Sequence, residues 1–573
     1  MKKKIVRRDN AANFHNINDM LSTVYKSRGA TQSYPCEYSL KQLHMPHSMV
    51  GLEHAAELLA AALEGEKRLL IVGDFDADGA TSTALCMRCF EAFGHKNVDY
   101  LVPNRFEFGY GLSPEIVGVA LERRPDYIIT VDNGISSIQG VARAKAAGVR
   151  VIITDHHLPG RELPDADAIV NPNLEACRFP SKNLAGVGVA FYLMSALRAK
   201  LREKLWFERK ALAEPNLANY LDLVALGTVA DVVPLDHNNR ILVANGLSRM
   251  RAGRSCPGIA ALLEVANKPR HTLSATDMGF AVGPRLNAAG RLHDMTIGVR
   301  CLLSDSRDEA MLLAKDLDDM NQDRKLIEGA MQQEALTILQ QIDAREMAEQ
   351  RHGVCLYKAE WHQGVIGILA SRIKDRLHRP TVIFANGDNG VLKGSGRSIP
   401  GIHLRDVLDR VATQNPGLLD KFGGHAMAAG MSIKEGDFKA FEEAFDVCVK
   451  EEAHDECFEA VVLSDGELDE SGITLESADA IRAAGPWGQH FTEPMLDDIF
   501  NIVQQRIVGT KHLKLILCKE RASNVVFDAI AFNVDLDVWP NEAQRAHVVF
   551  RLDINEFRGR RTVQLLVEYL LPL

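Results

Sequence analysis

The stretch Leu69-Leu70-Ile71-Val72-Gly73-Asp74-Phe75-Asp76-Ala77-Asp78-Gly79 decides the fold of this chain. Its four consecutive apolar residues, bounded by Gly73, predict a strand buried on both faces, which is typical of a parallel sheet covered by helices. Three aspartates follow at alternate positions. Carboxylates packed this closely against a sheet repel one another unless a cation offsets their charge. The stretch therefore predicts a buried strand that leads into a divalent-metal site.

The pattern D-x-D-x-D-G also opens an EF-hand calcium loop, which is the first alternative. An EF-hand needs a glutamate at loop position twelve, where this chain has Leu85, and a helix in front, where this chain has Leu69 to Val72. Both features exclude a calcium loop. A solvated acidic turn without a ligand remains the second alternative, and it fits two aspartates better than three beside a buried strand.

Length and composition are those of an ordinary globular protein with several domains, at 573 residues, 46% hydrophobic and 25% charged. The basic start, Met1 to Arg8, is followed by no apolar core, so we expect neither a signal peptide nor a membrane segment. Of the ten cysteines, only Cys86 and Cys89 have a C-x-x-C spacing, and no second pair accompanies them. We therefore expect core packing for this pair, reduced thiols and a cytoplasmic protein.

The formal net charge of −10 differs from that of most nucleic-acid-binding proteins, which carry an excess of basic residues. A nucleic-acid substrate would then require a local positive field, supplied in part by metal ions.

Strand and helix patterns alternate after about residue 46, which predicts a doubly wound α/β domain. The helices are expected at Glu53–Leu63 and Thr81–Phe93, and further strands at Val98–Val102, Tyr127–Val131 and Val149–Thr154.

Polar turns follow two of these strands and one later helical stretch. Tyr127–Val131 leads to Asp132-Asn133-Gly134, Val149–Thr154 leads to Asp155-His156-His157, and Tyr220–Leu226 leads to Asp231. The carboxyl ends of parallel strands meet at one edge of a sheet, where ligands bind. Mixed oxygen and imidazole ligands suit manganese or magnesium better than zinc. We expect two Mn²⁺ or Mg²⁺ ions, of the kind that activate water and stabilise charge on phosphate oxygens, at Asp76, Asp78, Asp132, His156 and Asp231.

These motifs, taken in order, resemble the signatures of the DHH phosphoesterase superfamily. The resemblance implies that Asp76 and Asp78 each hold one metal, that Asp132 bridges both, and that His156 and Asp231 complete the second site. It also implies that the remaining polar residues support the ligands or face the phosphate. The candidate catalytic residues are Asp74, Asp76, Asp78, Asp132, Asp155, His156, His157 and Asp231.

A long helix is expected from Ser304 to Gln350, followed by a second α/β segment that resembles the DHH-associated domain. Glycine-rich loops in this segment allow backbone N–H groups to approach an anion. Two arginines near Pro284, before the long helix, are candidates for a bidentate phosphate clamp. The predicted phosphate-binding and DNA-binding residues are Arg105, Arg285, Asn287, Arg291, Ser395, Arg397, Gly423, Gly424 and His425.

The C-terminal part is rich in short strands, expected at Asn501–Val508, His512–Cys518, Asn524–Phe532, Val548–Asn555 and Thr562–Tyr569. This number of antiparallel strands suits an OB-like barrel, which often binds single strands. Basic residues and one aromatic residue could form its binding surface, or could equally be solvated hairpin tips: Lys511, Lys514, Phe557, Arg558, Arg560 and Arg561.

The predicted fold is α/β: a parallel-sheet DHH domain joined by a long helix to a second α/β (DHH-associated) domain, plus a C-terminal OB-like β-barrel. The expected ranges are 1–45 for a peripheral segment, 46–260 for the DHH catalytic domain, 261–350 for a helical connector, 351–452 for the DHH-associated domain and 453–573 for the OB-like domain.

The resemblance implies a single-stranded-DNA-specific 5′-to-3′ exonuclease that releases mononucleotides in DNA repair, mismatch repair and recombination. It also implies cooperation with a single-strand-binding protein and a RecQ-like helicase. No residue named here determines the polarity of digestion. Two alternatives remain: a phosphodiesterase of short oligonucleotides or cyclic dinucleotides, and a non-catalytic DNA-binding replication scaffold.

Overall fold

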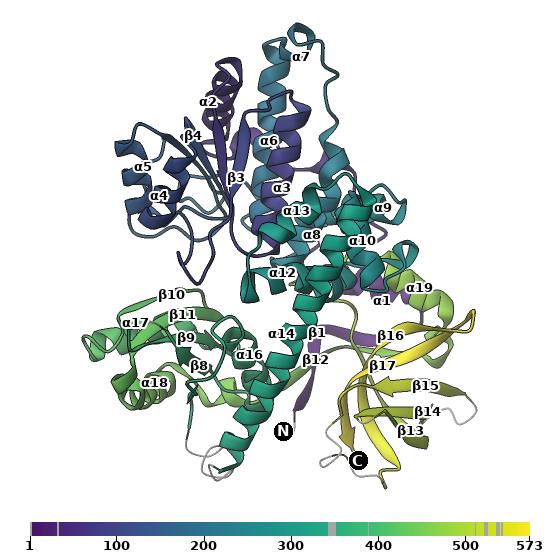
Figure 1. Cartoon of the computed structure of the whole chain (residues 1–573). Coiled ribbons are helices and arrows are strands. Elements are labelled where there is room, and N and C mark those ends of the chain that lie inside the picture. Colours follow the sequence, from purple (N-terminus) through teal and green to yellow (C-terminus); the bar gives the residue numbers. More distant parts are fainter. Residues whose placement is uncertain are drawn as a thin grey trace. The chain divides into compact units, whose positions relative to one another are not determined.

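The computed structural model describes residues 3–30, 34–341, 351–387, 389–509, 511–520, 525–534, 539 and 542–573. Its contacts divide the chain into two compact units (Figure 1). The larger unit contains Asp9–Asn321 and Asp465–Leu573, and the smaller contains Met1–Arg8 and Gln322–Ser464. Across the described ranges, no helix combines the length and the apolar character needed to cross a membrane.

The larger unit contains the predicted parallel sheet. Its strand order is β3-β2-β4-β5-β6, and every neighbouring pair is parallel. The order reverses between β2 and β4, so the loops after these two strands diverge there. The strands are β2 (Leu69–Val72), β3 (Val98–Leu101), β4 (Tyr127–Val131), β5 (Arg150–Thr154) and β6 (Ala168–Val170).

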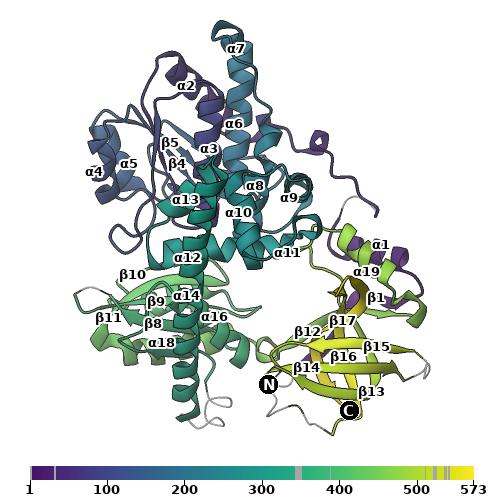
Figure 2. The same ribbon diagram turned by 45° about the vertical axis from the view of Figure 1, so that its right-hand side comes forward.

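Helices cover both faces of this sheet, as the four apolar residues of β2 predict. Leu69 and Ile71 belong to the core that contains α2, α3 and α6, whereas Leu70 and Val72 belong to the core that contains α4 and α5. Figures 1 and 2 show α4 and α5 on the side of the sheet away from α3 and α6. These helices are α2 (Leu52–Glu64), α3 (Ala77–Ala92), α4 (Pro114–Glu122), α5 (Ile138–Ala146) and α6 (Gly186–Glu203).

One boundary in this layer differs from the prediction. The sequence places the start of α3 at Thr81, but the helix begins at Ala77 because the Asp76 carboxylate caps it. The second and third aspartates of the repeat, Asp76 and Asp78, therefore lie at a helix N-terminus.

A helical region follows the sheet: α7 (Trp206–Arg209), α8 (Leu221–Ala230), α9 (His237–Arg251), α10 (Pro257–Val265), α11 (Ala275–Asp277), the π-helix η5 (Met278–Val282), α12 (Gly283–Leu292) and α13 (Thr296–Leu303). Pro284 occupies the first turn of α12, where its missing N–H has no intrahelical partner to lose.

The predicted long helix is α14 (Arg307–Gln341), which passes from the larger unit into the smaller one. Its 35 residues span about 50 Å. Residues 342–350 of the predicted helix lie outside the described residues.

The smaller unit contains a mixed sheet of order β10-β11-β9-β8-β7, in which only β7 and β8 are parallel. The expected glycine-rich loops at 394–398 and 422–430 are largely strands, which is a correction to the prediction. The elements are β7 (Val354–Tyr357), α16 (Ile366–Leu377), β8 (Thr381–Asn386), β9 (Val391–Arg397), α17 (Leu404–Gln414), β10 (Lys421–Gly424), β11 (Ala428–Lys434) and α18 (Phe438–Glu452).

The C-terminal strands form a closed barrel of order β13-β14-β15-β17-β16, as predicted (Figure 2). Its alternate residues Leu513, Leu515 and Leu517 are buried inside. The predicted start of the third strand, Asn524, lies outside the described residues. The strands are β13 (Leu496–Val508), β14 (His512–Lys519), β15 (Val526–Ala531), β16 (Arg545–Phe557) and β17 (Arg560–Pro572).

The N-terminal segment has more regular structure than its sequence suggested. Strand β1 (Lys4–Phe14) pairs with β12 (Val461–Leu468), and α1 (Ile17–Ser27) follows it. Arg28, after α1, makes two hydrogen bonds of 2.6 and 2.7 Å to the buried Asp465 carboxylate. This pair fastens the segment to the chain that leads into α19 (Leu475–Ala483) and the barrel.

Candidate metal centre

The first aspartates of the site lie where β2 passes into α3. One oxygen of Asp76, Oδ1, accepts hydrogen bonds from the backbone N–H groups of Asp78 and Gly79, at 2.9 and 3.0 Å. The positive end of the helix dipole stabilises negative charge at this position. The cap thus fixes the Asp76 side chain and uses only one of its oxygens.

Asp78 lies in the first turn of α3 and is almost fully buried. Its two oxygens accept the backbone N–H groups of Gly186 and Val187, at 2.6 and 2.9 Å. These N–H groups belong to the start of α6, so Asp78 ties two helix N-termini together. It therefore has a structural task in addition to any contact with a metal ion.

Asp132 follows β4 in the left-handed backbone region, with φ of 63°. This conformation is strained for a non-glycine residue and occurs preferentially at functional sites. The next residue, Asn133, donates from Nδ2 to the carbonyls of Val72 and Val131, at 3.1 and 2.9 Å. Asn133 thereby fixes the end of β4 to the end of β2.

The third motif, after β5, is organised around Asp155. Its Oδ1 accepts the backbone N–H groups of His156 and His157 and lies 2.7 Å from Nδ1 of the His157 ring. Its Oδ2 accepts the N–H of Ile135, at 2.9 Å. Asp155 is fully buried, and its hydrogen bonds orient the two histidines.

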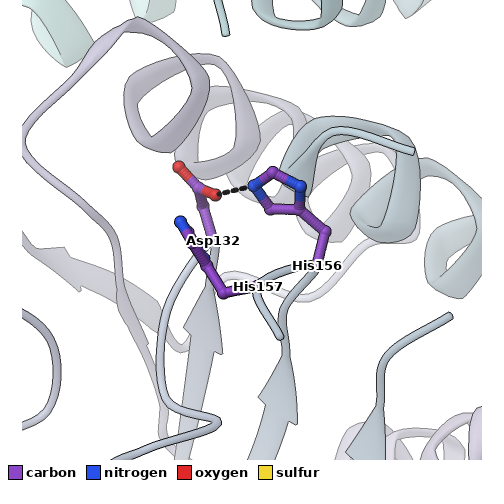
Figure 3. A group of neighbouring side chains, drawn as sticks. All are labelled: Asp132, His156 and His157. Carbon is purple, nitrogen blue, oxygen red and sulfur yellow. Dashed lines mark ion pairs between the residues drawn. The ribbon is translucent and has the colours of Figure 1, made fainter. Parts of the chain in front are cut away.

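His156 brings the segments together. Its Nε2 lies 3.1 Å from Oδ1 of Asp132 and 3.4 Å from Oδ2 of Asp231, which caps the C-terminus of α8. Figure 3 shows the His156 imidazole pointing toward the Asp132 carboxylate, with the His157 ring beside them. Residues separated by about a hundred positions thus present ligand atoms to one point.

Three overlapping groups of side chains have ligand atoms within 4.8 Å of one another. They are Asp74, Asp76 and Asp132; Asp78, His156 and Asp231; and Asp132, His156 and His157. The first two groups suit two ions, with Asp132 close to both. Asp74, expected to support the ligands or to face the phosphate, also belongs to the first group, so we propose it as a further ligand.

The polar atoms of the site fit bound cations. Oδ1 of Asp74 and Oδ1 of Asp132 are buried and accept no hydrogen bond in the described part of the chain. Buried oxygens of this kind are costly unless another partner compensates them. A divalent ion is such a partner, and carboxylate with imidazole is a donor set that Mn²⁺ and Mg²⁺ accept.

Burial and mutual repulsion dominate the electrostatics of the metal-free site. Burial, and then the charges of neighbouring aspartates, hold the pKa values of Asp74, Asp132 and Asp231 well above their usual range. The same two causes raise the pKa of Asp78 to about 7. Burial and repulsion therefore oppose ionisation of these four carboxyl groups, and a bound cation would offset both.

The Asp155–His157 pair behaves in the opposite way. Burial opposes the charge on each partner, but the hydrogen bond and the attraction between them lower the pKa of Asp155 and raise that of His157 to about 9. In the metal-free protein, His157 is therefore positively charged at neutral pH.

Sequence reasoning missed Tyr110, although it lies within the glycine-bracketed segment 109–111. Its hydroxyl donates to the Asp132 carbonyl at 3.3 Å and lies 3.2 Å from Nδ1 of His157. The two flanking glycines, both at positive φ, were the available signal.

The predicted phosphate-binding residues divide between the two units. In the larger unit, the Arg105 guanidinium lies over the Phe75 ring, 3.9 Å from its centre. Arg285 pairs with Asp318 at 2.8 Å and donates to the Ala281 carbonyl. Arg285 therefore has partners within the protein and Arg105 lies beside the aspartates, and phosphate binding by either residue stays a prediction.

Asn287 also has a local partner in the larger unit, because its Oδ1 accepts the backbone N–H of Ala77, at 2.8 Å. Arg291 lies on the same helix, α12.

In the smaller unit, Arg397 donates to Ser395 Oγ at 3.1 Å. Both residues lie on β9, which pairs through β11 with the strand that carries Gly423 and Gly424. The His425 N–H bonds the Ala428 carbonyl at 2.8 Å. The glycine pair and Arg397 thus share one sheet, and their role in binding DNA stays a prediction.

Family models match three parts of the chain: the DHH family, N-terminal domain, at residues 68–228; the DHHA1 domain at 350–451; and the RecJ OB domain at 464–569. The single-stranded-DNA-specific exonuclease RecJ of Dickeya dadantii is 55% identical over 97% of this chain and 96% of its own length. The chain belongs to the RecJ family. RecJ of Escherichia coli is 53% identical over the same shares of both chains.

Solved RecJ structures agree with this assignment. The crystal structure of Thermus thermophilus RecJ in complex with Mn²⁺ matches with a TM-score of 0.78 and 30% identity, covering 96% of this chain and 76% of that one. The Mg²⁺ complex of the same protein matches with a TM-score of 0.71, 28% identity and coverage of 96% and 74%. RecJ proteins therefore share the fold of this chain, and those two structures contain the ions that its donor set suits.

Proposed function

We propose that this chain is a metal-dependent exonuclease that hydrolyses single-stranded DNA from its 5′ end and releases mononucleotides. The observation that supports the proposal is two neighbouring groups of three candidate ligands each: Asp74, Asp76 and Asp132, and Asp78, His156 and Asp231. The names of the RecJ relatives support the substrate class, single-stranded DNA. The direction, the end product and the role in repair and recombination are proposed from the resemblance of the motifs.

Each group of ligands would hold one metal ion. Asp74, Asp76 and Asp132 would hold one Mn²⁺ or Mg²⁺ ion, and Asp78, His156 and Asp231 the other. Bound ions of this kind activate water for attack on phosphorus and stabilise charge on the attacked and leaving oxygens. The protein contributes a fixed geometry, because helix caps, Asn133 and Asp155 hold the ligand-bearing segments before any ion binds.

Positive groups next to the ligands would orient the phosphodiester. His157 carries its proton at neutral pH, since its pKa is about 9, and its ring contacts Tyr110. Arg105, held over Phe75, adds a second charge beside the aspartates. In the smaller unit, Ser395, Arg397 and the Gly423-Gly424 pair are the proposed contacts to the rest of the DNA backbone.

We further propose functional boundaries close to the expected ones: catalysis at 46–260, phosphate binding at 351–452 and single-strand binding by the barrel at 453–573. A single-strand-binding protein and a RecQ-like helicase are the proposed protein partners. A cytoplasmic location is consistent with the ten cysteines, all of which are free thiols.

The test incubates the purified full chain and Mn²⁺ with three substrates: single strands labelled at either end, duplexes and dinucleotides. Release of labelled mononucleotides first from the 5′ end of unpaired DNA is the expected result. Cleavage of dinucleotides alone would instead place the chain with phosphodiesterases of short substrates, and binding without cleavage would make it a scaffold.

A further inference from the structure

Phe280 presents an aromatic ring to solvent on a rigid segment of the larger unit. Its side chain is 83% exposed, whereas Met278 and Val282 on either side are buried. The residue lies in the middle of the π-helix η5, between α11 and α12. Single π-helical turns within helices occur frequently at functional sites, and exposure of a whole phenyl ring has no benefit for folding.

The π-helix is packed against the element that delivers Asp231. A Cβ atom on Gly279 would lie 3.3 Å from Val229, and one on Gly283 would lie 3.1 Å from the Ala230 side chain. Ala230 is the last residue of α8 and immediately precedes Asp231. The glycines at positions 279 and 283 therefore bring the backbone around Phe280 against the end of α8, next to Asp231.

The helix that continues from the π-turn, α12, contacts the aspartate loop. A Cβ atom on Gly290 would lie 1.7 Å from the carbonyl oxygen of Phe75, and Asn287 binds the N–H of Ala77. Segment 278–292 thus touches both the Asp231 side and the aspartate loop. Val232, which directly follows Asp231, is a second exposed apolar residue, at 62%.

We propose that Phe280 stacks on a base of the single strand whose phosphate is bound at the metal centre, an inference that rests on the proposed function. A nucleotide chain presents phosphates on one side and bases on the other, and the segment that carries the exposed Phe280 packs against the elements that carry the acidic ligands. Every base has a π-face, so a phenyl ring binds unpaired bases without regard to sequence.

The same contact would contribute to strand selectivity. In a duplex, each base is already paired and stacked, so a ring gains access to its face only after the base is unstacked. Phe280 is therefore a specificity-determining residue that favours unpaired DNA, while the ligands carry out the hydrolysis.

The experiment measures kcat and KM with Mn²⁺ for Phe280→Ala, Phe280→Trp and the unmodified chain on a single-stranded oligonucleotide. Removing one base–aromatic stack corresponds to roughly a 5- to 150-fold loss of binding, so Phe280→Ala should raise KM by that factor and leave kcat nearly unchanged. Phe280→Trp should restore KM. Leu312→Ala is the matched control, because Leu312 is an apolar side chain with 65% exposure on α14.

A second series places one abasic site at successive nucleotides from the 5′ end. The unmodified chain should show a raised KM at one position of the abasic site, and Phe280→Ala should lose that position dependence. Equal KM values for all three proteins, or a changed melting temperature with unchanged kinetics, would assign the ring to packing and overturn the proposal. An unmodified chain that cleaves no DNA would instead refute the proposed function itself.

Discussion

The Asp78 carboxylate accepts the backbone N–H of Gly186 across 108 residues of sequence, at 2.6 Å. The same glycine faces Asp132, because a Cβ atom at position 186 would lie 2.5 Å from Cβ of Asp132. The start of α6 therefore contacts residues of both ligand groups, and it leaves no space there for a side chain.

Gly186→Ala should move Asp132 and the start of α6 apart and so disturb both ligand groups. The added methyl must displace either Asp132 or α6, so we expect weaker Mn²⁺ binding and a large loss of activity, together with a destabilisation of about 1–3 kcal/mol. Gly329→Ala is the control, since a Cβ atom there meets nothing within 4 Å. Gly148 also has open space around it, but its positive φ would strain an alanine. Calorimetric titration with Mn²⁺ measures the effect, and unchanged affinity in Gly186→Ala would contradict this explanation.

Asp132→Asn should abolish turnover while it preserves the fold. Asparagine has the same shape and tolerates the left-handed backbone, but it loses the negative charge of a residue that belongs to one ligand group and lies 3.1 Å from His156 of the other. Loss of residues that only support ligands costs up to about 100-fold, so loss of a ligand should cost at least that in kcat.

The same substitution should raise the melting temperature of the metal-free protein, because it removes one of several repelling buried carboxyl groups. It should also reduce the further increase that Mn²⁺ produces. Near-normal turnover would remove Asp132 from the mechanism.

Metal binding should strengthen as pH rises from about 6 to 8. The folded-state pKa values of Asp74, Asp132 and Asp231 are raised, and that of Asp78 is about 7, so the metal-free protein gains stability from their neutral forms at low pH and loses it as pH rises through these values. A cation needs the ionised forms and must displace protons.

The increase in melting temperature on adding Mn²⁺ should therefore be larger at pH 8 than at pH 6. Calorimetry in two buffers of different ionisation enthalpy should detect proton release on binding at pH 6. An affinity that is independent of pH would show that the carboxyl groups are already ionised without metal.

The ligand segments were predictable from sequence, but part of their arrangement was not. Buried apolar runs that end in aspartate or histidine identify strand ends, and the rule that parallel strands share a carboxyl edge brings Asp132 and His156 together. The second task of Asp78 depends on where α6 packs, and no local pattern encodes a contact with residue 186.

Glycines produced the clearest error. Gly394 and Gly396 resemble loop residues by local propensity, yet both lie in strand β9. A Cβ atom on Gly394 would lie 2.5 Å from the Phe384 ring, and one on Gly396 would lie 2.9 Å from Leu404. Tertiary packing, rather than turn formation, requires glycine at these positions.

Arg28→Met should destabilise the larger unit, because it leaves the Asp465 carboxylate buried without its partner. Both side chains are nearly inaccessible, at 3% and 4%. Removing one partner of such a pair typically lowers the free energy of unfolding by about 3–5 kcal/mol, which a urea titration measures. Lys145→Met is the control, since its partner Asp165 is 93% exposed and a pair of that kind contributes at most about 1 kcal/mol. Equal effects of the two substitutions would show that the Arg28 pair is not important for stability.

Asn287→Ala should weaken Mn²⁺ binding even without DNA. Asn287 was predicted from sequence to contact phosphate, but its Oδ1 accepts the N–H of Ala77, directly after Asp76. Loss of this acceptor frees the start of α3, and supporting residues of this kind change metal affinity by roughly 10- to 100-fold. Titration of the DNA-free protein with Mn²⁺ measures the change, with Asn287→Ser as a partner variant that keeps a side-chain acceptor. If Mn²⁺ affinity is unchanged and only KM for DNA rises, Asn287 contacts the substrate through its Nδ2 group and does not position the aspartate loop.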